Sequence, residues 1–387
     1  MGVYNIEVGD DLTGYCKLQS AFVTPLKPAA TDAFRARSIT MGDVKNRVFP
    51  GDRRGTRSRV ERIEGRQPVI PWSAQVVFRP SGALGTAPDI GDLLKLALGV
   101  ETITGSTSVV YTPLKDPTAI YATIYRKGTS MVELVHGAIV QTLRISWSGD
   151  DFVTMDFSGI ARNFAEAGTT TTSGTNATTA STGVTVADAD FLRAYGVVSV
   201  GAFNASGAGF QIASVNYTTE GIVLDATVTY NTGQTVAPYL PTATFTGNPL
   251  HSAGRATLSL DGGATTIGHL SGFIEIATGL DLWNREAQSS SAVDVFMASQ
   301  REVSFGFEIL NKKAESYLLS LFSRKVSQDL QIILGDTSTE KLKIDMDVCQ
   351  IDPSPRDLPE SGPGTISLTG VALASSAGED EITLTLI

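Results

Sequence analysis

Residues 72–99 read "WSAQVVFRPSGALGTAPDIGDLLKLALG" and combine two hydrophobic periods. In "WSAQVVF" the residues W, A, V and F stand at every second position, which is typical of a half-buried strand. In "DIGDLLKLALG" the apolar residues lie three and four apart, which predicts a short helix that Asp89 caps and Gly99 ends. The stretch therefore predicts a strand followed, after a turn, by a helix.

The same order of elements continues along the chain and then recurs. After this helix, strands are predicted at 120–125, 137–148 and 152–159, the last two as a hairpin. In the second half, the alternating residues 303–309 lead into "NKKAESYLLSLF" (311–322), a predicted helix with Asn311 as its cap, and strands are predicted at 329–334, 341–351 and 365–373. The order strand, helix, strand, hairpin thus appears twice, although residue identity between the halves is weak.

A Thr/Ser/Gly-rich stretch lies between the halves. Residues 168–183, "GTTTTSGTNATTASTG", carry no charge and too few apolar side chains to build a core, so they predict a linker or mobile loop. Further alternating strands are predicted at 221–230 and 254–263.

From these patterns we expect a mainly β protein made of two β-sandwich or barrel-like domains, each with a short flanking helix. The predicted divisions are a first domain over 1–166, a linker over 167–187 and a second domain over 188–387.

Composition and charge narrow the class of protein. The chain has 387 residues, 42% of them hydrophobic, and a formal net charge of -10. Residues 1–166 are close to neutral, whereas 251–387 hold 10 basic against 19 acidic residues, an asymmetry that suits association between the two ends of different copies. No apolar run is long enough to span a bilayer, and the N-terminus lacks the pattern of a signal peptide. Cys16 and Cys349 are expected to be free thiols.

Few residues suggest catalysis or metal binding. The three histidines, His136, His251 and His269, have no metal-ligand spacing, and we expect His136 and His251 at surface or turn positions. No nucleophile elbow or phosphate-binding loop is present, and the acidic turns at 149–151 and 261–263 fit hairpins better than calcium loops. We therefore expect no catalytic, cofactor or metal site, although paired carboxylates of a glycosidase could still form by folding.

An arginine run stands out against this acidic background. Residues 53–66, "RRGTRSRVERIEGR", contain the following six arginines: Arg53, Arg54, Arg57, Arg59, Arg62 and Arg66. Three roles are open for them: contact with another copy of the chain, a solvated loop, or contact with nucleic acid.

Two segments carry a resemblance to a known family. Residues 62–99 resemble the tail tube (major tail) proteins of long-tailed bacteriophages, which run an arginine-rich "IEG" approach into a strand, a "PSG" turn and a "PDIG" helix start. Residues 135–163, with "GAIV" and "FSGIA", are similar to the hairpin that follows in that family. The resemblance covers about a hundred residues of the first half, and the second half matches it only in element order.

The resemblance implies a structural virion protein and no enzyme. It implies subunits that stack as rings into the tail tube of a siphophage, with inner strands closing into a β-barrel around an acidic channel for DNA ejection. Implied partners are further copies of the chain, the tape measure protein and DNA in the lumen, and the tail-tip and tail-terminator proteins. The protein would be assembled in the host cytoplasm and reside in the virion, without a membrane or cofactor.

The resemblance also suggests roles for particular residues. The arginine run occupies the place of a loop that reaches toward the neighbouring ring, and Asp345 and Asp347, on a predicted barrel strand, are candidate lumen-facing residues. If both halves are tube domains, the ring is a trimer with pseudo-sixfold symmetry; a plain hexamer is the second option. The alternatives from other classes are a carbohydrate-binding or adhesin-like β protein and, less supported, a glycan-cleaving enzyme.

Overall fold

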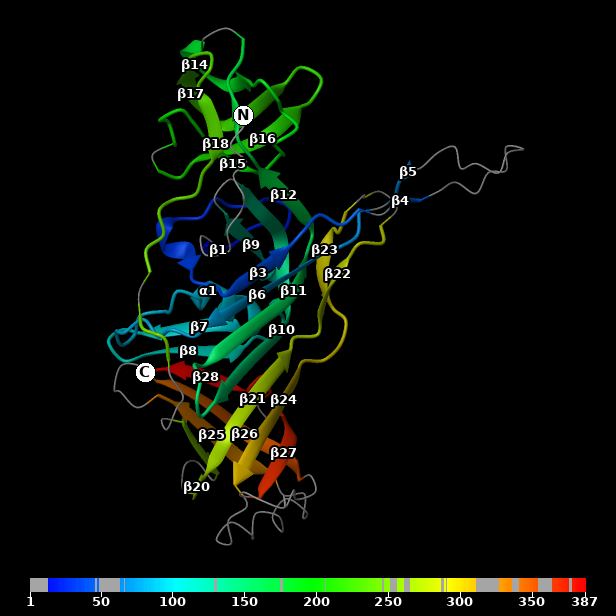
Figure 1. The fold of residues 1–387 in the computed structure, drawn as a ribbon. Coiled ribbons are helices and arrows are strands. Elements are labelled where there is room, and N and C mark those ends of the chain that lie inside the picture. The colour runs from blue at the N-terminus through cyan, green and yellow to red at the C-terminus, as the bar shows by residue number, and fades with distance from the viewer. Residues whose placement is uncertain are drawn as a thin grey trace, which may run out of the picture.

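A computed structural model describes most of the chain. The described residues are 13–45, 47–48, 63–65, 67–128, 131–174, 177–205, 207–245, 247–250, 256–260, 265–286, 289, 291–310, 327–335, 341–353, 364–375 and 378–387. Over these residues the protein is mainly β, with large curved sheets and a single α-helix (Figure 1). The expected mainly β class is confirmed.

The first part of the chain forms twelve strands and the helix. They are β1 (Thr13–Leu18), β2 (Ala33–Phe34), β3 (Ser38–Met41), β4 (Arg47–Val48), β5 (Ile63–Glu64), β6 (Ile70–Val77), α1 (Gly91–Leu98), β7 (Gly99–Thr104), β8 (Ser108–Pro113), β9 (Ala122–Lys127), β10 (Val132–Ser148), β11 (Thr154–Ala161) and β12 (Asn163–Ala167). Short 3-10 turns lie at Ala30–Asp32 and Pro117–Ala119. We call β1–β12 the first repeat.

The last part of the chain forms ten strands, which we call the second repeat. They are β19 (Ala256–Leu260), β20 (Thr265–Ile267), β21 (His269–Ala277), β22 (Leu280–Trp283), β23 (Asp294–Met297), β24 (Glu302–Leu310), β25 (Gln328–Leu334), β26 (Leu342–Pro353), β27 (Thr365–Ala372) and β28 (Thr383–Leu386). The strands predicted from alternation in both halves are confirmed, and β10 begins before the predicted 137–148.

The two repeats share one pairing scheme. Strands β1, β2, β3, β4, β5, β6, β9, β10, β11 and β12 correspond in order to β19, β20, β21, β22, β23, β24, β25, β26, β27 and β28. Each antiparallel pair of the first set, such as β3–β6, β6–β11 or β10–β12, has its counterpart in the second: β21–β24, β24–β27 or β26–β28. The internal repeat expected from element order is therefore present in the strand topology.

The correspondence holds residue by residue in one long stretch. The segment from Ser38 to Val77 and the segment from Ser271 to Leu310 have the same length, and each contains a short hairpin, β4–β5 or β22–β23, at the same place. The outer pairs of these hairpins, Arg47–Glu64 and Leu280–Met297, occupy matching positions. Because no insertion or deletion interrupts the match, residues of one repeat can be assigned to residues of the other.

Eight strands form a continuous wall that runs through both repeats. Its order is β3-β6-β11-β10-β21-β24-β27-β26, and every neighbouring pair is antiparallel. The wall is part of a barrel-like network of eighteen strands around one large hydrophobic core. Followed from pair to pair, the described strands do not return to β3, so the wall is open between β3 and β26.

Strand β10 links the wall to a second, outer sheet. Its first half pairs with β9 and β12, and its second half pairs with β11 and β21. The change occurs near Gly137, whose positive φ of 59° and contacts with Phe22 leave no room for a side chain. The Gly137 N–H, which this bend removes from the ladder, donates to the buried Gln19 side chain at 2.7 Å.

A glycine at the same position of each repeat lets neighbouring strands approach closely. "FSGIA" in β11 corresponds to "LTGVA" in β27, with Gly159 and Gly370 at matching positions. A Cβ atom on Gly159 would lie 1.9 Å from the Ile139 carbonyl oxygen, and one on Gly370 would lie 2.4 Å from the Gln350 carbonyl oxygen. The shared restriction supports the residue assignment between the repeats.

The segment between the repeats folds into a sheet of its own. It consists of β13 (Thr170–Thr171), β14 (Ala177–Thr185), β15 (Val197–Val200), β16 (Phe210–Asn216), β17 (Gly221–Tyr230) and β18 (Thr235–Pro238), in the order β13-β18-β15-β16-β17-β14. This inserted sheet has a separate core and lies apart from the wall (Figure 1). The linker predicted over 167–187 is therefore wrong: its threonines, which are β-branched, form β13 and β14, and the second repeat begins only at β19.

The helix prediction is confirmed in place and corrected in detail. Helix α1 ends at Gly99, whose φ is 109°, but its N-cap is Ile90 rather than Asp89. Most of its residues are buried, because it packs against β1, β7, β8 and β10. The second predicted helix, 311–322, lies outside the described residues. Within the described part of the chain, no helix has the length and hydropathy needed to cross a membrane.

The matched glycines yield a stability prediction. Gly159→Ala and Gly370→Ala should each lower the free energy of unfolding by about 1–3 kcal/mol or more, because the added methyl group forces backbone strands apart. Gly105→Ala, which places its methyl group in open space, is the matched control and should change stability by less than about 0.5 kcal/mol. Urea denaturation checks this; equal stability of all three variants would contradict the close approach.

Candidate assembly interface

One face of the wall is rich in serine, threonine and charged side chains. Strand residues alternate between the two faces, and Leu143, Ile145 and Trp147 of β10 point into the large core. Serine and threonine are the most frequent residues on the opposite face, which also carries Phe273 and Val371; they include Ser38, Ser73, Thr142, Ser146, Thr154, Ser158, Ser271, Ser304, Ser367 and Thr369. We call this surface the polar face.

The charges on the polar face are mainly negative. Among the described wall residues, the acidic ones on this face are Asp156, Glu275, Glu302, Glu308 and Asp352, and the basic one is Arg144. The field of this surface therefore repels polyanions.

Arg144 is held flat against the face. Its guanidinium lies 3.1 Å from a carboxylate oxygen of Glu275, directly across the β10–β21 pair, and 4.1 Å from the centre of the Phe273 ring. Both charged side chains are partly exposed, so the pair adds less than about 1 kcal/mol to stability. Its effect is to neutralise the only described arginine of the polar face.

The repeats are joined side by side within the chain by strand pairing and by a buried ion pair. Seven residue pairs between β10 and β21 continue the wall from the first repeat into the second. Strand β28 pairs with β8 of the first repeat. The Arg301 guanidinium, only 13% exposed, lies 3.2 Å from Glu381 and donates to the Leu114 carbonyl oxygen at 2.8 Å.

A hairpin of the second repeat also covers the end of the first repeat's wall. Leu280, Leu282 and Val295 of β22–β23 pack on Ile139 and Ile160 of β10 and β11. Nearby, the Arg162 side chain donates to the Ala292 carbonyl oxygen at 2.7 Å. The hairpin thus clasps the neighbouring repeat across the strand junction.

The two ends of the wall are unpaired edges. Strand β3 pairs with β6 on one side, and residues 350–353 of β26 pair with β27 on one side; the described strands place no partner on the other side of either. Open edges of this kind are surfaces to which another strand can add.

The structure places Asp345 away from the wall segment of β26. Asp345 lies where β26 pairs with β25 and β28, and its carboxylate accepts from Gln331 at 2.9 Å and lies 3.0 Å from the Lys343 ammonium. Asp347 is exposed on the same strand. A lumen role for both stays a prediction, but the wall itself offers other carboxylates, above all Glu302 and Glu308. Which part of β26 belongs to the wall depends on its pairing with other strands, and alternation in the sequence does not reveal that pairing.

The six arginines of the run lie outside the described residues. The structure does place the strands near them: in the sequence, Arg53, Arg54, Arg57, Arg59 and Arg62 stand between β4 and β5, and Arg66 follows β5. By the match in segment length, residues 51–60, with four of these arginines, correspond in sequence to residues 284–293 between β22 and β23.

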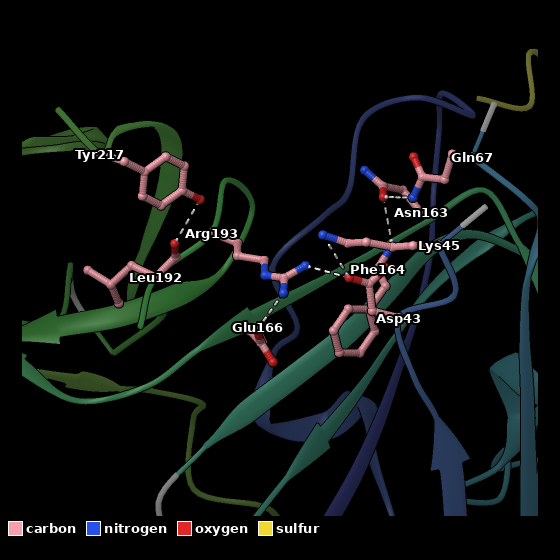
Figure 2. A network of polar contacts seen from close by, with 9 residues as sticks. All are labelled: Asp43, Lys45, Gln67, Asn163, Phe164, Glu166, Leu192, Arg193 and Tyr217. Atoms are coloured by element: carbon pink, nitrogen blue, oxygen red, sulfur yellow. Dashed lines mark hydrogen bonds and ion pairs between the residues drawn. The ribbon is translucent and has the colours of Figure 1, made fainter. Parts of the chain in front are cut away.

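The inserted sheet is fixed to the first repeat by ion pairs. Arg193 lies between two carboxylates of the first repeat, 2.9 Å from Asp43 and 2.9 Å from Glu166, as Figure 2 shows. On another side, Lys27 lies 2.7 Å from Asp225, and the Tyr15 hydroxyl donates to the Pro241 carbonyl oxygen at 2.5 Å.

A buried histidine sits at the same seam. His136, predicted at a surface or turn position, is fully buried, because it lies on the part of β10 that belongs to the outer sheet and its side chain packs against the inserted segment. Its ring packs edge-on against Tyr195 at 5.1 Å, and no hydrogen-bond partner of its nitrogens lies among the described residues. Burial and the nearby Arg162 lower the pKa of His136 to about 4.

The described residues offer little for chemistry. No group of three or more His, Cys, Asp or Glu side chains among them could hold a metal ion. Cys16 and Cys349 are both buried and free. Burial raises the pKa of the Cys16 thiol and raises that of Cys349 to about 12, so neither is an activated nucleophile.

Neither the family models nor the curated proteins include a match to this sequence. The fold and the surfaces described above therefore carry the functional argument.

His136 gives a pH-dependent prediction. The folded-state pKa is lowered, so between pH 6.5 and pH 4 the unfolded chain binds a proton that the folded chain does not, and stability falls as the pH falls. His136→Phe should remove up to about 3 kcal/mol of this decline. Urea denaturation of both proteins at several pH values between 7.5 and 4 checks it; parallel decline in the two would contradict the assignment.

Proposed function

We propose that this chain is a structural subunit that assembles side by side into rings and, by stacking of rings, into the tail tube of a long-tailed bacteriophage. The observation that carries the proposal is the junction between the two repeats. One repeat offers an edge strand of its wall to the other, while the same two kinds of edge, β3 and β26, stand open at the ends of the chain.

Such a junction is head-to-tail. The edge at β10 differs from the edge at β21, so the contact is heterologous, and a contact of this kind generates a ring when the rotation closes. With two equivalent repeats in each chain, three chains would give a ring with pseudo-sixfold symmetry. In this arrangement each repeat is a β-sandwich, and the joined walls form a closed β-barrel, which removes the open edges.

The polar face is suited to line the channel. A surface of serine, threonine and carboxylates hydrates well and repels phosphates, so DNA can pass without being retained. The resemblance of residues 62–99 and 135–163 to tail tube proteins supports the same assignment. On this proposal the protein is part of the virion, and its partners are other copies, the tape measure protein, DNA, and the tail-tip and terminator proteins.

Assembly is the first test of the proposal. The purified protein should form rings or tubes with a central hole about as wide as a DNA duplex, visible by negative-stain electron microscopy. A protein that stays monomeric at high concentration and binds a glycan would instead support the carbohydrate-binding alternative.

Charge reversal tests which carboxylates face the channel. Glu302→Lys with Glu308→Lys should leave folding and tube formation nearly intact, because neither side chain is buried, but should make the tubes retain DNA in a salt-dependent way. Asp345→Lys with Asp347→Lys is the matched comparison, and its tubes should retain little DNA. DNA retention measured across a salt series checks both variants. Retention by the second variant alone would mean that the part of β26 with Asp345 and Asp347, and not the polar face, lines the channel.

A further inference from the structure

One turn of the inserted segment carries two of the contacts at the seam between the inserted sheet and the first repeat. In the turn 193–196, the Gly196 N–H donates to the Arg193 carbonyl oxygen at 3.1 Å. The Arg193 side chain lies between two carboxylates of the first repeat, as Figure 2 shows. The Tyr195 ring packs edge-on against His136, with 5.1 Å between the ring centres. The turn therefore holds the seam through ion pairs and through an aromatic contact.

The two sides of this contact are held differently. Residues 132–136 of β10 pair with β12, and residues 132–135 pair also with β9, so His136 lies on a central strand. Tyr195 is bound to the inserted sheet instead, because its N–H donates to the Ile212 carbonyl oxygen of β16 at 2.6 Å. The inserted sheet has a hydrophobic core of its own. The turn can therefore lift from β10 without breaking the strand pairs beneath it.

The surroundings of His136 suit the neutral imidazole alone. The side chain is fully buried, and neither ring nitrogen has a hydrogen-bond partner among the described residues. The charged group that acts on it is the Arg162 guanidinium, on the β11–β12 connection. The other described neighbours are neutral side chains from the remaining elements around His136: Gln19, Phe22, Thr123, Asn163 and Tyr195. A proton on the imidazole would place a second cation beside Arg162 in a site without water, which is costly.

The charges at the seam point the same way. The network in Figure 2 contains two cations and two carboxylates, which are Arg193, Lys45, Asp43 and Glu166. Together with Arg162, these groups already have an excess of one positive charge. Protonation of His136 would raise this excess and weaken the contact further.

We propose that the turn 193–196 is an acid-released contact: on acidification, protonation of His136 lifts the turn from β10 and opens the seam between the inserted sheet and the first repeat, while the wall stays folded. The inference does not rest on the proposed ring assembly. The ion pair of Lys27 with Asp225 and the hydrogen bond of Tyr15 with Pro241 lie on another side of the inserted segment and remain as a tether.

The direction and size of the effect follow from proton linkage. In the docked state, burial and Arg162 lower the pKa of His136 to about 4, whereas an exposed imidazole has a pKa of about 6.5. The released state therefore binds the proton more tightly, and its population rises as the pH falls from 6.5 toward 4. Between pH 7.5 and pH 5 the ratio of released to docked molecules should rise by about 30-fold.

Hydrogen exchange of the full chain, measured by mass spectrometry, tests the inference. The Arg193 N–H donates to the Glu166 carbonyl oxygen across the seam at 3.1 Å, so a peptide covering 189–196 reports release. Its exchange rate, divided by the intrinsic chemical rate, should rise about 30-fold between pH 7.5 and pH 5, while peptides of β6 and β11 stay unchanged. An equal rise in all peptides would mean global unfolding and would overturn the inference, and so would the absence of any rise.

A histidine variant identifies the responsible group. His136→Phe should abolish the rise in the 189–196 peptide, because the phenyl ring keeps the contact with Tyr195 and takes no proton. His269→Phe, on β21 and away from the seam, is the matched control and should keep the rise of about 30-fold. A rise that persists in His136→Phe would assign the response to another group and contradict the inference.

A second variant leaves His136 in place. Arg193→Gln removes the ion pairs of the turn, so exchange of the 189–196 peptide should rise roughly fivefold at pH 7.5, and the further rise at pH 5 should remain. Arg144→Gln removes an ion pair of similar exposure on the polar face and should leave this peptide unchanged. Equal exchange of the two variants at pH 7.5 would mean that the turn does not hold the seam.

Discussion

The antiparallel pairing of β10 with β21 is the contact on which the rest of the structure depends. It joins two repeats of the same topology into one wall. Because paired residues lie on the same face of a sheet, it also decides which side chains of the two repeats share a surface. Because β10 bends near Gly137 and continues into the outer sheet, the same strand belongs to both the wall and the outer sheet. Removal of this pairing would leave two repeats with open edges.

The polar face follows from this wall and from strand alternation. Because Leu143, Ile145 and Trp147 point into the core, the residues between them must lie on the opposite face. The pairing register extends this division into a core face and a polar face over all eight strands. A surface with five carboxylates and a single, paired arginine among its described residues is suited to a passage for a polyanion and poorly suited to binding one.

The inserted sheet adds a separate unit without disturbing the repeat. It lies between β12 and β19 in the sequence, so it interrupts neither repeat. Arg193 anchors it through Asp43, on the β3–β4 connection, and Glu166, on β12. Burial of His136 beside Tyr195 shows that the seam is packed and not merely bridged by ion pairs.

The sequence by itself determined the strands with clear alternation, among them β6, β10, β24 and β26, the position of α1 and the recurrence of element order, because alternation and helical periods are local properties of the chain. It also pointed to the arginine run and to an acidic second half. It did not reveal that the Thr/Ser/Gly-rich stretch forms β13 and β14, since threonine fits both a linker and a strand. Nor did it show that β10 pairs with β21 or that Asp345 lies outside the wall segment, because partners far apart in sequence are chosen by the packing of whole sheets, and this choice decided which carboxylates share the polar face and which edges stay open.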